Sequence, residues 1–378
     1  MTRLLRKVSK KFFIVSNIGV VIAFLLVCCT GFLSPGRYWY IAVLGVGFPF
    51  IVLALVLFIL FWLFFKSRWA LLSATALLLG WWQVHALFGF HLFSSFKPEK
   101  PAAALRVMQW NVSRLDQMNL KRPGGNYRQP ILDFIKEMNP DILCMEEFLE
   151  SNNPRELAEN IPYFTNTLNY PYHFFARDHR PWDGVYEHGV IIFSKYPIVD
   201  TLRLRYSGPD SLKAAESLIH TDIDVHGRRI RVFATHLQSL RFDGNDYNTI
   251  RTITKGDNIA VDKSKGILKK FRLAYFLRSK QAELVRREMD ASPYPVLLCG
   301  DFNDIPNSFA YSKIRGDHTD AFLASGFGIG RTFASLSPTL RIDYIFTDKK
   351  IEVLQFKKTK LRYSDHYPLV ADVALPEE

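Results

Sequence analysis

The segment Val296–Asn303 has the sequence VLLCGDFN, an apolar run of strand type that ends in Gly-Asp-Phe-Asn. Three other apolar runs end in a similar way: VMQW at Asn111, ILCM at the pair Glu146–Glu147, and VFAT at His236. Strand ends that meet at one edge of a sheet build a rigid, water-accessible site. Carboxylate and amide oxygens are the ligands that Mg²⁺ and Mn²⁺ prefer. One polar residue after a strand is common, but four ends of this kind together predict a metal-assisted catalytic site.

The chain around these segments, residues 105–376, alternates between short apolar runs and helical patterns. Ile142–Met145 is typical of a buried strand, and Ser217–Val225 turns back into a second strand at Ile230–Thr235. Residues Lys265–Met289 carry apolar side chains at helical spacing among many Lys and Arg, which predicts a long amphipathic helix. This mixture of strands and helices predicts layered α/β architecture rather than a helix bundle.

The first 97 residues have a different composition. Between Lys11 and Lys97 the only charged side chains are Arg37, Lys66 and Arg68. Three apolar stretches, at about residues 12–33, 38–65 and 69–90, are each long enough to cross a bilayer as a helix, which takes about twenty residues. A cleaved signal peptide is the alternative for the first stretch, but it has no evident small-residue cleavage site and two more stretches follow it. We therefore predict a membrane anchor of three transmembrane helices at 1–97, a linker at 98–104 and a catalytic domain at 105–376.

The basic residues of the anchor predict its orientation. Five precede the first apolar stretch, Lys66 and Arg68 lie between the second and third, and Arg37 alone lies in the first loop. Because cytoplasmic loops carry the excess of Lys and Arg, the N-terminus and the second loop are expected in the cytoplasm. Three crossings then place the catalytic domain outside the cytoplasm, in an integral protein of the plasma (inner) membrane.

The charge of the chain is unevenly divided. The formal net charge is +12, but 38 basic and 35 acidic residues from position 101 onward give that part only +3. Binding to a nucleic-acid backbone draws on clustered Lys and Arg, so a near-neutral domain argues mildly against it. The helix predicted at Lys265–Met289 is the one basic element, and its charges either form a binding face or are simply solvated. The four cysteines are too few for a disulfide framework, and pairing of Cys144 with Cys299 is left open.

Seven segments of the chain, in this order, resemble the endonuclease/exonuclease/phosphatase superfamily, which includes DNase I, apurinic endonucleases, inositol-polyphosphate 5-phosphatases and bacterial sphingomyelinases. They are VMQWNV (Val107–Val112), PDILCMEE (Pro140–Glu147), GVIIFSKYPI (Gly189–Ile198), ATHL (Ala234–Leu237), VLLCGDFN (Val296–Asn303), RIDYIF (Arg341–Phe346) and SDHYP (Ser364–Pro368). GDFN and SDH together are the most specific of them. The resemblance spans 105–376 and implies a DNase I-like four-layer α/β sandwich, in which two mixed sheets pack face to face with helices outside. It says nothing about the three predicted transmembrane helices.

The resemblance also implies roles at the metal and the attacking water. Glu147 would ligate a Mg²⁺ or Mn²⁺ ion, with Asn111 and Asp365 nearby. Asp301 would orient or deprotonate the water, with help from Asn303. In-line attack on a phosphate requires such a positioned hydroxide and a cation on the phosphate oxygens.

Other residues would act on the phosphate itself. His236 and His366, the latter supported by Asp343, would contact the phosphate and stabilise its developing charge. Arg341 is expected either to contact the phosphate or to form a surface ion pair. His188 is a further candidate for a substrate contact at the edge of the site, against the alternative of a solvated loop histidine.

Two positions depart from the pattern of apurinic endonucleases. Ser113 stands where those enzymes carry an acid, and Glu187 stands where they carry a Tyr. Both changes argue against abasic-site repair. The expected function is therefore that of a membrane-anchored, metal-dependent phosphoesterase that acts on a lipid headgroup or another phosphoester outside the cytoplasm. A membrane-anchored nuclease acting on DNA or RNA is the first alternative, and a catalytically inactive module that binds lipid or protein is the second. No protein partner and no choice between phosphomonoester and phosphodiester follow from the residues.

Overall fold

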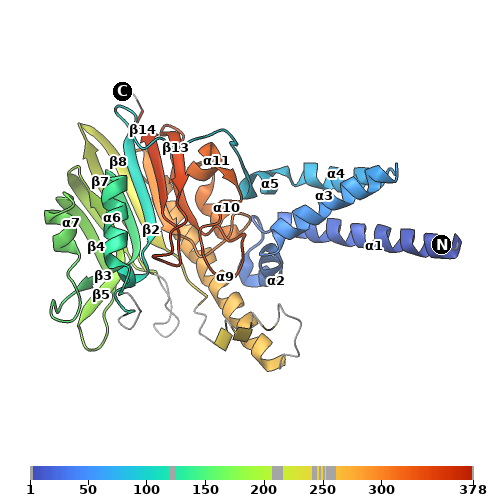
Figure 1. Ribbon diagram of the computed structural model, residues 1–378, viewed down its shortest axis with the longest axis horizontal. Coiled ribbons are helices and arrows are strands. Elements are labelled where there is room, and N and C mark those ends of the chain that lie inside the picture. Colours follow the sequence, from blue (N-terminus) through green and yellow to red (C-terminus); the bar gives the residue numbers. More distant parts are fainter. Residues whose placement is uncertain are drawn as a thin grey trace.

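The computed structural model describes residues 3–119, 125–206, 216–240, 245–246, 248–249, 252 and 261–376. A catalytic region built on two β-sheets lies at one end of the molecule, and the N-terminal helices project from it (Figure 1). The short strand β1 (Gly89–Phe90) follows these helices and pairs with β11 (Phe327–Gly328) of the catalytic region.

Each sheet has six strands and mixes parallel with antiparallel pairs. The first sheet has the order β13-β14-β2-β3-β5-β4 and consists of β2 (Leu105–Asn111), β3 (Ile142–Ser151), β4 (Tyr172–His179), β5 (Tyr186–Ser194), β13 (Glu352–Lys358) and β14 (Leu369–Ala374). The second has the order β10-β12-β9-β8-β7-β6 and consists of β6 (Ile198–Leu204), β7 (Leu218–Val225), β8 (Arg228–His236), β9 (Val296–Asp301), β10 (Thr319–Asp320) and β12 (Asp343–Thr347). The two parallel pairs, β2 with β3 and β8 with β9, lie at the centres of the two sheets.

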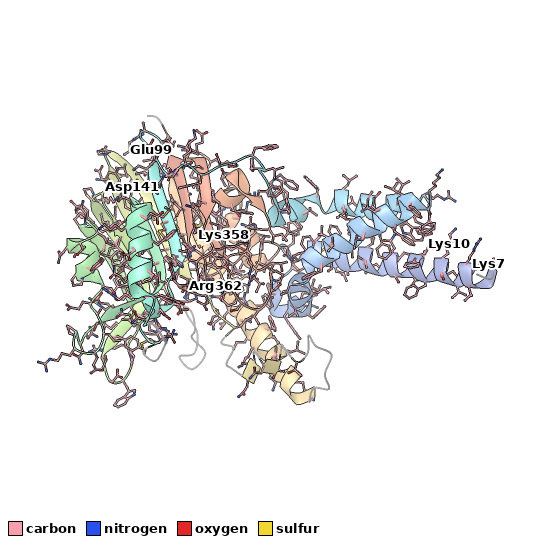
Figure 2. All side chains as sticks on the ribbon, in the orientation of Figure 1. Lys7, Lys10, Glu99, Asp141, Lys358 and Arg362 are labelled. Carbon is pink, nitrogen blue, oxygen red and sulfur yellow. The ribbon has the colours of Figure 1, made fainter. Side chains whose placement is uncertain are left out.

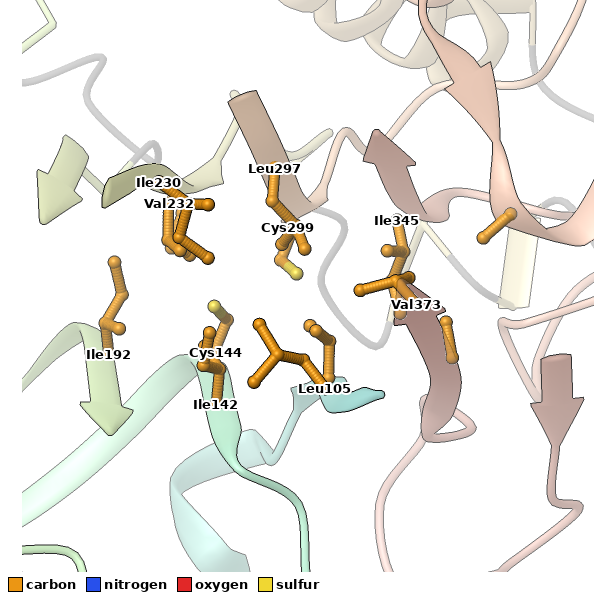
Figure 3. Packing of buried hydrophobic residues seen from close by; sticks show 14 of the residues in the cluster. Leu105, Ile142, Cys144, Ile192, Ile230, Val232, Leu297, Cys299, Ile345 and Val373 are labelled. Carbon is orange, nitrogen blue, oxygen red and sulfur yellow. The ribbon is translucent and has the colours of Figure 1, made fainter. Parts of the chain in front are cut away.

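The sheets pack face to face over an aliphatic core (Figure 3). Ile142 and Ile192 of the first sheet face Val232 and Leu297 of the second across this core. Cys144 and Cys299 point toward each other from opposite sheets, and both are free thiols. Because alternate residues of each strand point into this layer, the apolar runs that predicted strands also predicted the core.

Helices cover the two outer faces. The first sheet is covered by α6 (Arg128–Met138) and α7 (Ile161–Asn166), and the second by α9 (Val261–Asp290) and α10 (Phe309–Arg315). A short helix, α11 (Ala321–Ser325), lies beside β12 and β13. The four-layer α/β sandwich is thus confirmed, and α9 contains the amphipathic helix that the sequence predicts.

The region predicted as a membrane anchor, here called the anchor, consists of α1 (Arg3–Cys28), α2 (Pro35–Gly45), α3 (Phe48–Phe64), α4 (Ala70–Leu79) and α5 (Trp81–Leu87). Of the described helices, only α1 is by itself long and apolar enough to cross a membrane. The stretches expected at about 38–65 and 69–90 are each divided into two helices, with a bend of 54° between α2 and α3 and of 72° between α4 and α5. If each bent pair is one span, the chain has three. The first break falls at Gly47 and Pro49, where proline lacks the N–H that a continuous helix needs.

Candidate active site

The strand order brings the polar strand ends to one edge of the sandwich. In the second sheet, Asp301 at the end of β9 lies beside His236 at the end of β8 and beside Asp343 at the start of the antiparallel β12. In the first sheet, Asn111 at the end of β2 pairs with Glu146 of β3. His366 lies near the end of the loop between β13 and β14. Its carbonyl accepts a hydrogen bond from the Trp110 indole at 3.0 Å.

Asp301 is the centre of the site. Its Oδ2 accepts a hydrogen bond from Asn111 Nδ2 at 3.0 Å. The same oxygen lies 3.6 Å from His236 Nε2 and 3.7 Å from His366 Nε2. Its Oδ1 accepts the backbone N–H of Asn303 at 2.8 Å, which fixes the carboxylate plane. Three groups from three different chain segments therefore converge on one carboxylate oxygen.

The surroundings of Asp301 also change its acidity. Burial raises the pKa of the Asp301 carboxyl to about 6, with the neighbouring Asp343 adding to the rise and the charges of His366 and His236 opposing it. A carboxylate whose pKa lies just below neutral is ionised at pH 7 and still accepts a proton readily. The geometry and the acidity of Asp301 both suit a general base.

His366 is held by a carboxylate from β12. Its Nδ1 lies 3.0 Å from both oxygens of Asp343, which also accepts a hydrogen bond from Gln109 Nε2 at 3.3 Å. Burial alone would lower the pKa of His366, but the charges of Asp343 and Asp301 outweigh it and raise that pKa well above its usual value. His366 is therefore an imidazolium at neutral pH, with Nδ1–H directed at Asp343 and Nε2–H directed into the site.

A buried carboxylate that the sequence analysis missed, Glu216, supports the other side of the site. Its Oε2 lies 3.2 Å from His236 Nδ1 as an ion pair, although the N–H is not aligned as in a good hydrogen bond. Its Oε1 lies 3.3 Å from His188 Nδ1, and Oε2 also accepts the backbone N–H of Glu147 at 3.1 Å. Glu216 lies two residues before β7 and directly before the strand predicted at Ser217–Val225, so the signal was an acid at the beginning of a predicted strand instead of at its end.

Glu216 and its histidines set each other's ionisation. Burial alone would raise the pKa of Glu216, but the hydrogen-bond contact with His188, the close ion pair with His236 and the charges of both histidines hold it well below the usual range. Burial would likewise lower the pKa of His236, but the contact with Glu216 raises it to about 10, with help from Asp301. The site thus contains two histidines, His236 and His366, that carry a positive charge at neutral pH.

The backbone around the site is strained. Glu147 has a φ of 50° at a bulge in β3, and Asn303 has a φ of 52°. The four residues of the turn η1 (Ser113–Asp116), next to Asn111, also have positive φ values. A positive φ costs about 1–3 kcal/mol for each non-glycine residue. Such conformations persist where the surrounding structure holds them, often at functional sites. The hydrogen bond from the Glu147 N–H to Glu216 is one such restraint.

The donor set fits a hard divalent cation. Asp301 and Asp343 place carboxylate oxygens within 4.8 Å of each other and of a ring nitrogen of His366, although the imidazolium itself has no lone pair to offer an ion. Glu147 Oε1 lies 3.5 Å from Asn111 Nδ2, and the Glu147 side chain is 27% exposed, so it is open to solvent and to an ion. Buried Glu146 contributes less negative charge than the other acids, because its burial and the nearby Asp343 and Asp301 raise its pKa well above the usual value and favour its neutral form. Oxygen-rich, anionic surroundings of this kind suit Mg²⁺ or Mn²⁺.

The surroundings of Asp365 and His188 do not establish the contacts that the sequence predicts for them. Asp365 is exposed beside His366, and its carboxylate lies 3.4 Å from the Ser364 hydroxyl. His188 lies in β5 instead of in a loop, and it reaches the site through Glu216. A metal contact for Asp365 and a substrate contact for His188 stay predictions.

Arg341 does not have either of its expected roles. Its guanidinium is buried, lies 2.6 Å from Asp320 and donates to the carbonyl of Ala86 at 2.6 Å. The rings of Phe322 and Tyr344 lie 4.7 and 5.1 Å from it. These contacts bury the guanidinium and pair both of its terminal nitrogens, although Nε has no hydrogen-bond partner. The ion pair of Arg341 is therefore internal instead of on the surface, and its burial argues against a contact with a substrate phosphate.

Replacing Arg341 with Met is expected to destabilise the fold by about 3–5 kcal/mol, because it leaves Asp320 buried without its cation. Thermal unfolding of the detergent-solubilised protein measures this change. At a temperature where the variant is folded, its kcat on a phosphodiester should stay within about twofold of wild type, since Arg341 touches none of the site residues. A variant with normal stability and strongly reduced activity would restore the phosphate-contact hypothesis.

A family model described as the endonuclease/exonuclease/phosphatase family matches residues 108–245 and 276–366, and these ranges contain every site residue named above. The chain belongs to the endonuclease/exonuclease/phosphatase family. Members of this family are hydrolases that act on phosphoester bonds, and the chain is one of them. A second family model, a domain of unknown function (DUF8431), matches residues 10–87 of the anchor.

Solved structures are similar to this chain, and the first of them has the same fold. The endonuclease/exonuclease/phosphatase from Beutenbergia cavernae DSM 12333 is 20% identical, with a TM-score of 0.51 over 72% of each chain. The human Nocturnin catalytic domain with bound sulfate anion is 19% identical, with a TM-score of 0.48 over 72% of this chain and 93% of that one. D. rerio TDP2 complexed with single strand DNA product is 14% identical, with a TM-score of 0.49 over 72% of this chain and 99% of that one. A comparison with curated protein sequences gives no match.

Proposed function

We propose that this member of the family is a divalent-metal-dependent phosphoesterase that is anchored in a membrane and hydrolyses its substrate by in-line attack of water. The observation that carries the proposal is the convergence of Asn111, His236 and His366 on one oxygen of Asp301. A base between two cationic imidazoles is suited to accept a proton from water while the imidazoles neutralise charge on a phosphate.

Each side chain has a role in this proposal. Asp301 positions the attacking water and takes its proton, and Asn303 holds Asp301 through its backbone N–H. The Nε2–H groups of His236 and His366 bind non-bridging phosphate oxygens, where negative charge builds up. Asp343 keeps His366 in the tautomer that directs Nε2–H into the site. His188 lies beside Glu216 and is a candidate for a substrate contact at the edge of the site.

Glu147, Asn111 and Asp365 are the residues that would hold Mg²⁺ or Mn²⁺. When bound, the ion supplies Lewis-acid stabilisation of the phosphate oxygens. Asp301 is not assigned to the metal, because its Oδ2 already contacts Asn111, His236 and His366.

The anchor supports a substrate near the membrane. Lys7 and Lys10 lie at the end of α1 that points away from the catalytic region (Figure 2). The loop between α3 and α4, which contains Lys66 and Arg68, also lies far from that region (Figure 1). With basic residues on the cytoplasmic side, this arrangement supports an anchor at 1–97 with three crossings, a linker at 98–104 and an extracytoplasmic catalytic domain at 105–376 in the plasma membrane. Anchoring raises the effective concentration of a membrane-bound phosphoester at the site.

The nuclease alternative loses support from α9. Arg278, expected as part of a basic face, is buried, and Arg286 pairs with Asp290 and Asp317. Arg287 and Lys280 are paired with Glu288 and Glu283. Little unpaired charge is left along this stretch of α9 for a nucleic-acid backbone, which favours a phosphoester of the lipid-headgroup type.

Removal of divalent metal tests the proposed function. EDTA is expected to reduce hydrolysis of bis-p-nitrophenyl phosphate by the full-length protein by about 10³-fold or more, because phosphoryl transfer without the cation loses several kcal/mol of charge stabilisation. Added Mg²⁺ or Mn²⁺ should restore the rate. The same preparation should then be offered lipid phosphodiesters, phosphoinositides, plasmid DNA and RNA side by side. Activity that is insensitive to EDTA would reject the metal, and faster cleavage of nucleic acid at physiological salt would make the nuclease the better assignment.

A further inference from the structure

The anchor contacts the loop that directly follows the proposed catalytic base, Asp301. Residues 302–308, which follow β9 and are here called the β9 loop, contain Asn303 and Asn307. Asn307 is buried, and its Nδ2 donates to the carbonyl of Gly45 in α2 at 3.2 Å. The buried hydroxyl of Thr30, just after α1, lies within hydrogen-bond distance of the carbonyls of both Asn307 and Val27. Residues 29–47, which include α2 and are here called the first anchor loop, therefore contact the β9 loop through Thr30 and Gly45, which lie next to each other at Asn307.

A second set of contacts connects the same two loops through α9. The hydroxyl of Tyr275 donates to the carbonyl of Ala42 in α2 at 3.3 Å. The guanidinium of Arg278 lies 4.6 Å from the Tyr275 ring, donates to the carbonyl of Asn303 and lies 3.4 Å from Asp304. Tyr275 and Arg278 are both buried. The strained backbone at Asn303 is thus held from α2 by a continuous set of packed polar groups.

The space at this contact is closely filled. A methyl group at Gly45 would lie 2.9 Å from Asn307 Nδ2, and one at Gly31 would lie 2.8 Å from the Ser312 hydroxyl. A methyl group at Gly19 in α1, by contrast, would have no atom within 4 Å. The first anchor loop is therefore fitted to the catalytic region, whereas a tether that only holds an enzyme near a membrane needs no such fit.

We propose that the first anchor loop positions the active site: through Asn307 and Arg278 it holds the β9 loop so that Asp301 and Asn303 keep their catalytic geometry. This inference rests on the proposed function, because it assigns Asp301 to the reaction. The anchor and the catalytic region then act as one unit, and Asn307 is a positioning residue that does not touch the substrate. A shift of about 1 Å in a catalytic group costs up to about 10²-fold in rate, so loosening of this contact has a large effect.

The test uses full-length protein in detergent with a water-soluble substrate, bis-p-nitrophenyl phosphate. Because the substrate is soluble, proximity to a membrane does not contribute to its rate. Gly45→Ala inserts a methyl group into the contact, and Gly19→Ala is the matched control in open space. Thr30→Val removes the hydroxyl that lies beside Gly45 at the same contact, whereas Thr30→Ser retains it.

Gly45→Ala and Thr30→Val are each expected to lower kcat by about tenfold with KM changed less than about twofold, whereas Gly19→Ala and Thr30→Ser stay near wild type. Amide hydrogen exchange in peptides covering 302–308, measured without metal, should be about tenfold faster in the first two variants than in the controls. If Gly45→Ala does not fold, Thr30→Val alone decides the question.

The two measurements distinguish the possible failures. Unchanged exchange and unchanged kcat in a folded Gly45→Ala or Thr30→Val variant would overturn the positioning role. Faster exchange without loss of kcat would show that the contact exists but does not serve catalysis, which also overturns it. An inactive wild-type protein whose exchange responds as expected would instead reject the proposed function and leave only the structural contact.

Discussion

Replacement of Asp301 with Asn is expected to lower kcat by about 10³-fold or more while the protein remains folded. Asparagine keeps the shape of the side chain but cannot accept a proton from water, and loss of a positioned general base costs about 10²–10⁴-fold. The change also removes the partner of Asn111, His236 and His366, so the loss should lie at the upper part of that range. Initial rates with bis-p-nitrophenyl phosphate at saturating Mg²⁺ measure the effect.

Stability should not follow activity in this variant. The pKa of Asp301 is about 6, above its usual value of 3.8, because burial disfavours the ionised carboxylate. Ionisation of Asp301 therefore works against folding: this cost is absent below about pH 3.8, grows as the pH rises and is complete above about pH 6. Asp301→Asn removes the cost, so its unfolding temperature at pH 7.5 should be no lower than that of wild type.

A matched surface variant controls for charge. Asp317 pairs with Arg286 and Lys349, and its side chain is 61% exposed. Asp317→Asn removes the same charge and is expected to change kcat by less than about twofold, because exposed ion pairs contribute at most about 1 kcal/mol. Wild-type activity in Asp301→Asn would remove Asp301 from the mechanism, and equal losses in both variants would point to a general effect of charge.

The strand ends of the site could be predicted because their signal is local. An apolar run with an abrupt polar end marks Asn111, Glu147, His236 and Asp301 in the sequence itself. The parallel pairing of β2 with β3 and of β8 with β9 then brings equivalent ends to the same edge. Asp343 joins them although it begins a strand, since β12 runs antiparallel to β9.

Other features depend on contacts between distant segments, and the sequence alone does not reveal them. Arg341 stands next to site residues in the sequence, but its guanidinium forms an ion pair with Asp320 and donates a hydrogen bond to the carbonyl of Ala86. Ala86 lies near the end of α5, more than 250 residues away in sequence. The bend between α2 and α3 has a local cause in Gly47 and Pro49, but its direction follows from the docking of α2 on α9. Composition predicted apolar helices there and gave no sign of that docking.

Glu216 is the clearest case of a residue that only the structure reveals, and its replacement with Gln gives the second large expected effect. Glutamine keeps the size of the side chain but removes the charge that holds His236 and His188. We expect kcat to fall by about 10–100-fold at pH 7, the usual effect of removing the group that orients a site residue. Weaker restraint of the Glu147 backbone should add to the loss.

The pH dependence separates this role from a purely structural one. The pKa of His236 is about 10 because the contact with Glu216 overcomes the effect of burial. Without that carboxylate, burial is the dominant influence, so the pKa of His236 should fall into or below the neutral range. Protonated His236 then disappears as the pH rises from about 6 to 9 in the variant but not in wild type. The alkaline limb of kcat against pH should therefore move to lower pH in Glu216→Gln, and the deficit relative to wild type should grow with pH.

The raised pKa of His236 also makes the stability of the fold depend on pH. Because the folded-state pKa of His236 is raised, its contribution to stability is fully present below about pH 6.5 and is lost as the pH rises through about 10. Glu216→Gln should abolish this contribution, so the difference in unfolding temperature between wild type and variant should be larger at pH 6.5 than at pH 10. Thermal unfolding at the two pH values measures it.

Glu187→Gln is the matched control, since Glu187 neighbours His188 but pairs outward with Arg177 at 2.8 Å and Arg180 at 3.9 Å. It removes an acid next to His188 without touching His236, so its pH profile should coincide with that of wild type. A Glu216→Gln profile that is lower but parallel to wild type at every pH would mean that Glu216 supports the fold without setting the charge of His236. In that case the positive charge assigned to this side of the phosphate would have to come from His366 alone.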